Sequence, residues 1–105
     1  MRYAQITGWG KYAPPLLMTN DDMAKIVDTS DEWIFSRSGI RQRHYSHVST
    51  GEMAWLSAER ALAAAGVDAD DIDLIILGST TPEEICPNTA SYIKNKLGAK
   101  KAAAF

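Results

Sequence analysis

The stretch Asp28-Thr-Ser-Asp-Glu-Trp-Ile-Phe-Ser-Arg-Ser-Gly-Ile-Arg41 organises the reading of the whole chain. Thr29 or Ser30 can cap a helix whose first turn carries two carboxylates, and carboxylates suit the positive end of a helix dipole. The helix must end at Gly39, which readily adopts the left-handed conformation found after helix C-termini. The pattern therefore predicts a short helix that starts firmly, followed by an extended run from Ile40.

Trp33 and Arg37 are four residues apart, so they lie on one face of this helix. A flat aromatic ring and a guanidinium, flanked by the hydroxyls of Thr29 and Ser38, form a platform suited to an adenine and its phosphates. The alternative is structural, with Trp33 as a half-buried core aromatic and Arg37 as a surface charge. The spacing by itself favours this structural interpretation.

The run from Thr29 to Arg41 resembles the signature of the β-ketoacyl-acyl-carrier-protein synthase III family, T-S-D-E-W-I-x-x-R-T-G-I-x-x-R. The resemblance extends to both sides of the run and covers the whole chain. Its further segments are residues 8–14, Thr19-Asn20-Asp21, Asp73-Leu-Ile-Ile and residues 87–98. The resemblance implies an α/β fold, the N-terminal part of a thiolase-like fold, with a mixed sheet, a right-handed βαβ crossover and packed helices. Residues 1–105 would then be an incomplete segment of one condensing-enzyme domain.

The same resemblance implies roles for five residues. Trp33 would stack on the adenine of coenzyme A, and Thr29, Arg37 and Ser38 would border the same mouth. Ser38 stands where the family usually has threonine, which keeps the hydroxyl. Cys86 stands where the family often has a bulky apolar residue that reaches across a dimer interface to line the partner subunit's acyl pocket.

The reaction implied by the resemblance is transfer of an acyl group from acyl-coenzyme A to a cysteine, then condensation with malonyl-acyl-carrier protein. The family's catalytic cysteine, histidine and asparagine would all lie beyond Phe105, so no residue here receives a catalytic role. The implied partners are acyl-coenzyme A, an acyl-carrier protein and a second subunit, and no cofactor is expected. Two alternatives remain open: a relative that primes a polyketide or other secondary metabolite, and a stand-alone module that binds coenzyme A or a carrier protein.

Composition is that of an ordinary soluble domain, with 46% hydrophobic and 23% charged residues and a net charge of −2. This balance predicts no broad surface for nucleic acid or anionic membrane. One cysteine excludes an internal disulfide, and with two histidines it leaves no convincing metal site. No signal peptide or apolar run of about 20 residues is present, so we expect a cytoplasmic protein.

Periodicity and capping signals predict the remaining elements. Residues 3–9 alternate like a strand. Thr19 or Asn20 caps a helix through Val27, and residues 40–45 read as an edge strand or exposed connection. A capping box, Ser49 with Glu52, opens a helix that Gly66 ends, and its stripe of small residues predicts close contact with another backbone; the stripe comprises Ala54, Ala58, Ala61, Leu62 and Ala65. Residues 73–78 read as a parallel strand buried on both faces, residues 87–97 as a helix, and residues 102–105 as the start of another strand.

Two other groups of residues suggest chemistry, and both have a simpler explanation. The cluster Arg41, Arg43, His44 and His47 suggests phosphate contact but is more typical of a solvated face. Cys86 precedes a helix N-terminus and suggests a nucleophile with a histidine as its base. A lone cysteine beside proline is more often a small apolar filler, and we favour that interpretation over the nucleophile.

Overall fold

The computed structural model describes residues 3–105, which form two compact units. One unit comprises residues 13–47, and the other comprises the described residues up to 12 together with residues 48–105. The strands form two separate two-stranded sheets, one antiparallel and one parallel, rather than one mixed sheet. The predicted α/β class is confirmed.

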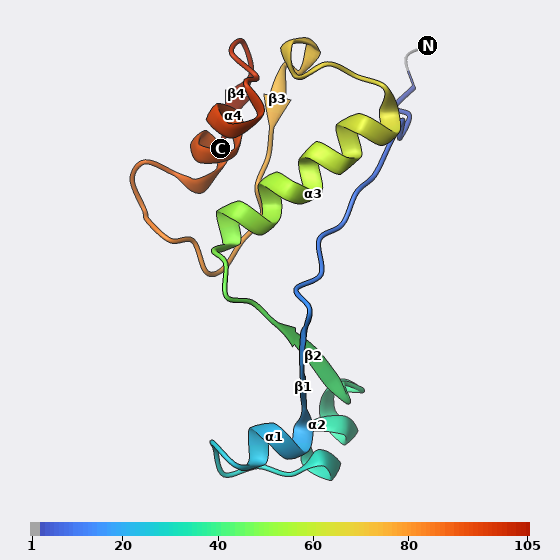
Figure 1. The fold of residues 1–105 in the computed structure, drawn as a ribbon, viewed down its shortest axis with the longest axis vertical. Helices are drawn as coiled ribbons and strands as arrows, with labels where there is room; N and C mark the ends of the chain where they lie inside the picture. Colours follow the sequence, from blue (N-terminus) through green and yellow to red (C-terminus); the bar gives the residue numbers. More distant parts are fainter. Residues whose placement is uncertain (1–2) are drawn as a thin grey trace. The chain divides into compact units, whose positions relative to one another are not determined.

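The unit of residues 13–47 pairs two short strands and carries two helices (Figure 1). Strand β1 pairs antiparallel with β2, with Leu16 opposite Tyr45 and Thr19 opposite Gln42. The elements are β1 (Leu16–Thr19), α1 (Asn20–Ala24), α2 (Asp31–Ser38) and β2 (Gln42–Tyr45). Strand β2 confirms the extended segment expected at residues 40–45, whereas β1 falls where we expected only a loop.

Helix α1 begins with the cap that its sequence predicts, but it is shorter than expected. Thr19 accepts a hydrogen bond from the Asp22 backbone N–H, and the Asp22 carboxylate accepts one from the Thr19 backbone N–H in return. Hydrogen bonds from Lys25 and then Thr19 hold the pKa of Asp22 well below its usual range. The predicted extension to Val27 is wrong, because the chain leaves the helix in a turn at Lys25, and Ile26 and Val27 are 69% and 48% exposed.

A buried asparagine holds this unit together. Asn20 is 1% exposed and donates from its amide to the Asp31 carboxylate and to the Ile40 carbonyl, each at 2.7 Å. Its amide oxygen accepts from the Arg43 guanidinium at 2.6 Å. A buried amide with its donors and acceptor all satisfied specifies one arrangement of the segments it joins. Asn20 therefore ties α1, α2 and β2 to each other.

The other unit contains the longest helix, α3, and a strand-helix-strand arrangement (Figure 1). Its elements are α3 (Thr50–Ala65), a single 3₁₀ turn η1 (Ala69–Asp71), β3 (Leu74–Ile75), α4 (Thr89–Leu97) and β4 (Ala103–Ala104). Ser49 caps α3 by accepting from the Glu52 N–H, and Asn88 caps α4 by accepting from the Ser91 N–H. The Ser49 cap and the C-terminal ends of both helices agree with the sequence prediction, whereas α4 begins at Thr89 and not at residue 87.

The small residues of α3 lie against the backbone of residues 8–10, as the alanine stripe predicts. A Cβ on Gly8 would lie 2.7 Å from the Ala61 carbonyl oxygen, and one on Gly10 would lie 2.3 Å from the Ser57 carbonyl oxygen. Atoms this close are backbone and cannot move aside, so only glycine fits at these two positions. Arg60 adds a hydrogen bond of 2.7 Å to the Lys11 carbonyl.

The strand predicted at residues 3–9 is wrong. No strand within the described chain pairs with this segment, which has no regular secondary structure. Gly8 lies against α3, but Ile6 and Trp9 on either side of it are 88% and 72% exposed. Alternation alone does not make a strand, because a strand also needs a neighbouring strand to accept its backbone hydrogen bonds.

Strands β3 and β4 are parallel, with Leu74 opposite Ala103 and Ile75 opposite Ala104, and α4 connects them. The parallel pairing is therefore confirmed. The expected burial of residues 73–78 on both faces is wrong for this chain, because Leu74 is 49% exposed and Ile76 is 67% exposed. Strand β3 pairs along one edge only, and the small core of this unit lies beneath α4; its buried apolar residues are Ala90, Ile93, Ala99 and Ala102.

Candidate functional site

Helix α2 presents Trp33 and Arg37 on one exposed face, as their spacing predicts. The Arg37 guanidinium carbon lies 4.8 Å from the centre of the Trp33 ring, within the range of a cation–π contact. Trp33 is 56% exposed, and no residue of α2 is buried. Within this unit Trp33 is therefore more than half exposed, and its role as a platform for adenine stays a prediction.

Thr29 lies beside Trp33 at the start of the same helix. Ser30, and not Thr29, is the N-cap, and its hydroxyl accepts from the Trp33 backbone N–H at 3.1 Å. Thr29 and Trp33 line a shallow hollow of about 400 Å³ together with Asp28 and Ser30. The Thr29 hydroxyl oxygen is buried and has no hydrogen-bond partner within residues 3–105. The hollow thus has one polar group whose hydrogen bonding is incomplete.

Ser38 does not join this group. Its hydroxyl donates to the Ile34 carbonyl at 2.7 Å and accepts from the Ile40 backbone N–H at 3.2 Å. Both bonds finish the C-terminal end of α2, and Gly39 follows in the left-handed conformation with φ of 70°. Ser38 is not among the residues that line the hollow, so the structure gives its hydroxyl a structural use.

The basic cluster after α2 is largely used inside its own unit. Arg43 donates to Asn20 and to the Thr19 carbonyl, and Arg41 lies 3.6 Å from the Asp31 carboxylate. His44 Nδ1 lies 2.5 Å from the Pro14 carbonyl oxygen. Arg41, His44 and His47 are exposed, as a solvated face predicts, whereas Arg43 is partly buried and bonds groups of its own unit. The sequence showed no sign of the Asn20 partnership, because Arg43 is 23 residues further along the chain.

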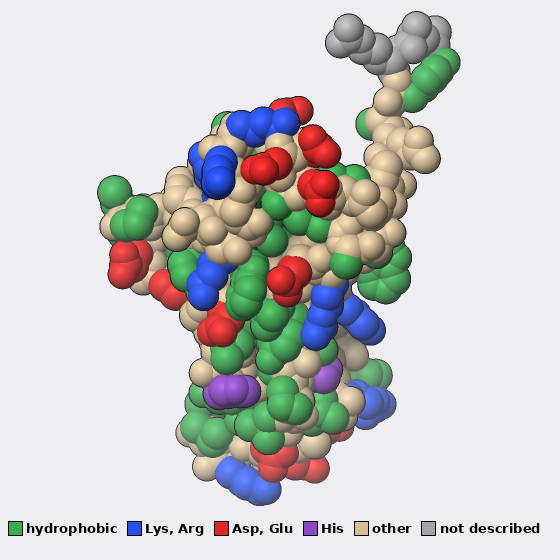
Figure 2. Space-filling view, turned by 45° about the horizontal axis from the view of Figure 1, so that its top comes forward, with side chains coloured by type: hydrophobic (Ala, Val, Ile, Leu, Met, Phe, Trp, Pro, Cys, Tyr) green, Lys and Arg blue, Asp and Glu red, His purple; other side chains and the backbone are tan. Residues whose placement is uncertain are grey.

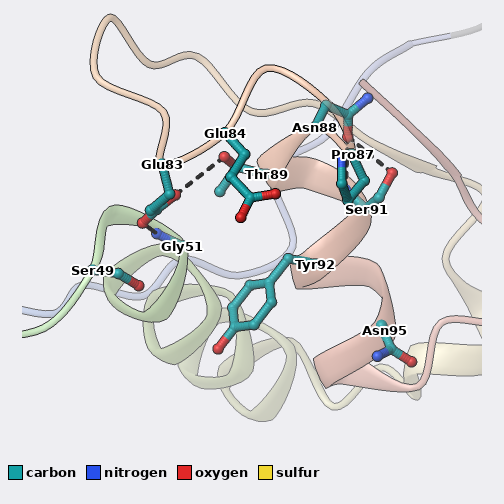
Figure 3. A pocket seen from close by; sticks show the side chains of 10 residues that line it. All are labelled: Ser49, Gly51, Glu83, Glu84, Pro87, Asn88, Thr89, Ser91, Tyr92 and Asn95. Carbon is teal, nitrogen blue, oxygen red and sulfur yellow. Dashed lines mark hydrogen bonds between the residues drawn. The ribbon is translucent and has the colours of Figure 1, made fainter.

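A second pocket, of about 450 Å³, lies between the first turns of α3 and α4 in the other unit (Figure 3). The Glu83 carboxylate accepts from the Gly51 backbone N–H at 2.6 Å and from the Thr89 hydroxyl at 3.2 Å. The Gly51 N–H is the main reason that the pKa of Glu83 is lowered, since it stabilises the ionised carboxylate. Sequence analysis missed Glu83, because the residue it bonds at α3 is 32 positions away.

Cys86 lies in the loop of residues 79–88, which leads from β3 to α4, and it is a free, exposed thiol. The two histidines proposed as its base belong to the other unit. Its neighbours Glu84 and Pro87 line the second pocket, but Cys86 does not. Cys86 is therefore accessible at the surface of its own unit.

The described surface has mixed charge. On the face shown in Figure 2, acidic and basic side chains are interspersed and hydrophobic side chains reach the surface between them. Among residues 3–105, no three His, Cys, Asp or Glu side chains gather closely enough to hold a metal ion. Every helix in the described range is too short or too polar to cross a bilayer.

Comparison with known proteins places these sites in context. No protein-family profile matches the chain. It is 50% identical over 103 residues to beta-ketoacyl-[acyl-carrier-protein] synthase III 2 of Vibrio vulnificus, a match that covers 98% of this chain and 28% of the relative. The chain thus spans less than a third of that relative, over an N-terminal portion.

Solved structures agree with the sequence match. The crystal structure of 3-oxoacyl-[acyl-carrier-protein] synthase III from Aquifex aeolicus superposes with a TM-score of 0.86 at 42% identity, covering 95% of this chain and 33% of that one. The crystal structure of a priming β-ketosynthase from a polyketide biosynthetic pathway superposes with a TM-score of 0.89 at 32% identity. This match covers 99% of this chain and 32% of that one. Over nearly its whole length, this chain is homologous in sequence and thiolase-like fold to the N-terminal segment of the β-ketoacyl-[acyl-carrier-protein] synthase III family.

Proposed function

We propose that this chain is the N-terminal portion of a 3-oxoacyl-[acyl-carrier-protein] synthase III, an acyltransferase that starts fatty-acid synthesis. The enzyme would move an acyl group from acyl-coenzyme A to a cysteine and condense it with malonyl-acyl-carrier protein, releasing carbon dioxide. It would work in the cytoplasm as a homodimer without a bound cofactor. The 50% identity over 103 residues to the Vibrio vulnificus relative supports this proposal.

The observation that carries the proposal is the exposed Trp33–Arg37 pair on α2. An indole side chain that is more than half exposed can stack on a nucleotide base, and the neighbouring guanidinium can pair with phosphate oxygens. Thr29, whose hydroxyl oxygen has no partner in the described chain, would complete the mouth after rotating toward the ligand. Ser38 contributes indirectly, by ending α2 where Arg37 can lie over the indole ring.

Cys86 would act in a different place, by lining the acyl pocket of the partner subunit. Its exposure at the surface of its own unit supports this role. Cysteine is smaller than the bulky apolar residue often found there in the family, so a longer or branched acyl chain would have more room. The acyl preference would then differ from that of relatives with the bulky residue.

A second candidate function is the priming step of a polyketide or other secondary metabolite. The superposition with a polyketide priming β-ketosynthase, which covers 99% of this chain, favours it specifically. Both candidates use the same fold and the same acyl-coenzyme A mouth. They differ in the acyl group accepted and in the acceptor of the condensation.

The test is a chimeric enzyme in which this chain replaces the 103 matched residues of the Vibrio vulnificus relative. With acetyl-coenzyme A and malonyl-acyl-carrier protein, the chimera should release carbon dioxide and form a 3-oxoacyl-carrier protein. Products from a range of acyl-coenzyme A substrates would separate fatty-acid initiation from polyketide priming. Calorimetry of the 105-residue chain with coenzyme A is the parallel measurement. Tight binding by that chain, with a folded but inactive chimera, would instead indicate a stand-alone binding module.

A further inference from the structure

The loop of residues 79–88 is held to both helices of its unit by polar contacts. The two oxygens of the Glu83 carboxylate reach different helices, one to the Gly51 N–H of α3 and the other to the Thr89 hydroxyl of α4 (Figure 3). The Thr50 hydroxyl adds a bond of 3.2 Å to the Thr81 carbonyl. Glu83 is thus the residue whose side chain joins the loop to the first turns of α3 and α4 together.

A carboxylate suits this place for electrostatic reasons. The first N–H groups of a helix have no partner within the helix, and both helix dipoles present their positive ends here. The other charged groups nearby are acidic: Glu84 of the same loop and Glu52 of α3. No Lys or Arg lines the pocket, so the helix N-termini provide the favourable interactions for the ionised Glu83.

The helices to which Glu83 binds are closely packed, whereas the residues of the loop are exposed. A Cβ on Gly51 would lie 3.0 Å from both Thr89 and Tyr92, so α3 and α4 are in close contact at this point. Thr89 is only 7% exposed, whereas Ile85 in the loop is 94% exposed and packs against nothing in its unit. Hydrogen bonds rather than apolar burial therefore decide where the loop lies.

We propose that Glu83 is a positioning residue that clamps the loop of residues 79–88 onto α3 and α4, and so determines where Cys86 lies. The hydrogen bonds of Glu83 to Gly51 and Thr89 support the clamp itself. Its consequence for acyl-chain choice rests on the proposed function, in which Cys86 lines the partner subunit's acyl pocket. Glu83 would then influence specificity without touching the acyl chain.

The experiment uses the single cysteine as its probe. A nitroxide attached to Cys86 reports loop mobility by electron paramagnetic resonance, and amide exchange reports the Gly51 hydrogen bond. Glu83→Gln keeps the size of the side chain but leaves it with one acceptor oxygen. The amide can therefore no longer accept from the Gly51 N–H and from the Thr89 hydroxyl through separate oxygens. It should make the label more mobile and speed exchange at Gly51 by about 3- to 10-fold. Glu84→Gln, at the adjacent position without a hydrogen bond to either helix, should change neither signal.

A pH titration provides a second readout that is independent of any substitution. Because the pKa of Glu83 is lowered, the clamp should be complete above about pH 4.5, the ordinary value, and should be lost as pH falls below it. The Glu83→Gln protein should lack this transition. Equal label mobility and Gly51 exchange in the wild-type and Glu83→Gln proteins would overturn the proposal. Coenzyme A binding at Trp33 tests the proposed function separately, since Trp33 belongs to the other unit.

Discussion

Replacing Trp33 by alanine should weaken coenzyme A binding in the chimeric enzyme by about 5- to 150-fold. Stacking of a base on an aromatic side chain is worth roughly 1–3 kcal/mol in nucleic-acid complexes, which corresponds to that range of affinities. Trp33 is 56% exposed, so its side chain is accessible to a ligand. Arg37→Ala should also weaken binding, by removing both the guanidinium beside the ring and a charge suited to phosphate.

The same change should cost little stability. Helix α2 buries none of its residues, so no core cavity forms when the indole is removed. The loss is the exposed contact with Arg37, worth about 0.5–1 kcal/mol. Trp9→Ala is the matched control, because Trp9 is 72% exposed and lies in the other unit, outside the hollow beside Thr29. It should leave affinity unchanged.

The assay is calorimetric titration with coenzyme A beside a thermal melt of each variant. Tryptophan fluorescence is a weaker assay, since Trp9 and Trp55 also contribute to the signal. Unchanged affinity in a Trp33→Ala protein that stays folded would refute the reasoning and make the platform structural only. A large fall in melting temperature with equal losses for all substrates would instead identify Trp33 as a core residue of the completed enzyme.

Three further outcomes are expected of the 105-residue chain. Radiolabelled acyl-coenzyme A should leave no stable label, because acyl transfer needs an activated thiolate and oxyanion donors; a stoichiometric thioester on Cys86 would contradict this. Sedimentation velocity at micromolar concentration should show self-association, because Leu74 of β3 and Ile76, just after β3, are exposed apolar residues. Ile76→Lys should reduce it, and a folded monomer would count against the idea. Ser30→Ala should destabilise α2 by about 0.5–2 kcal/mol in a chemical melt, whereas Thr29→Ala should not, because only Ser30 caps the helix.

The helix boundaries were largely determined by the sequence because their causes are local. The side-chain oxygen of a capping residue accepts a hydrogen bond from a backbone N–H three residues later, as in Ser30, Ser49 and Asn88. A glycine with positive φ ends each of these helices, at Gly39, Gly66 and Gly98. The Trp33–Arg37 contact is equally local, since one turn of helix brings the two side chains together.

Strands and burial depended on contacts that are distant in sequence. Residues 3–9 have the pattern of a strand but lie against α3, and residues 73–78 have the pattern of a buried strand but are half exposed. Strand β1 escaped prediction, because its four residues become a strand only when β2 pairs with them. The hydrogen-bond partners of a strand, and the side chains that bury its faces, come from distant segments of the chain. The residue pattern of the strand itself does not identify those segments.

The sites divide in the same way. The sequence alone indicated Trp33, Arg37 and Thr29, whose grouping follows from helix geometry and a recognisable motif. The structure decided that Ser38 uses its hydroxyl to finish α2, and that Glu83 joins a loop to two helices. It also decided that Asn20 is the buried centre of its unit. Tertiary folding alone can show which polar groups become each other's partners, because they meet only after segments more than 20 residues apart have packed.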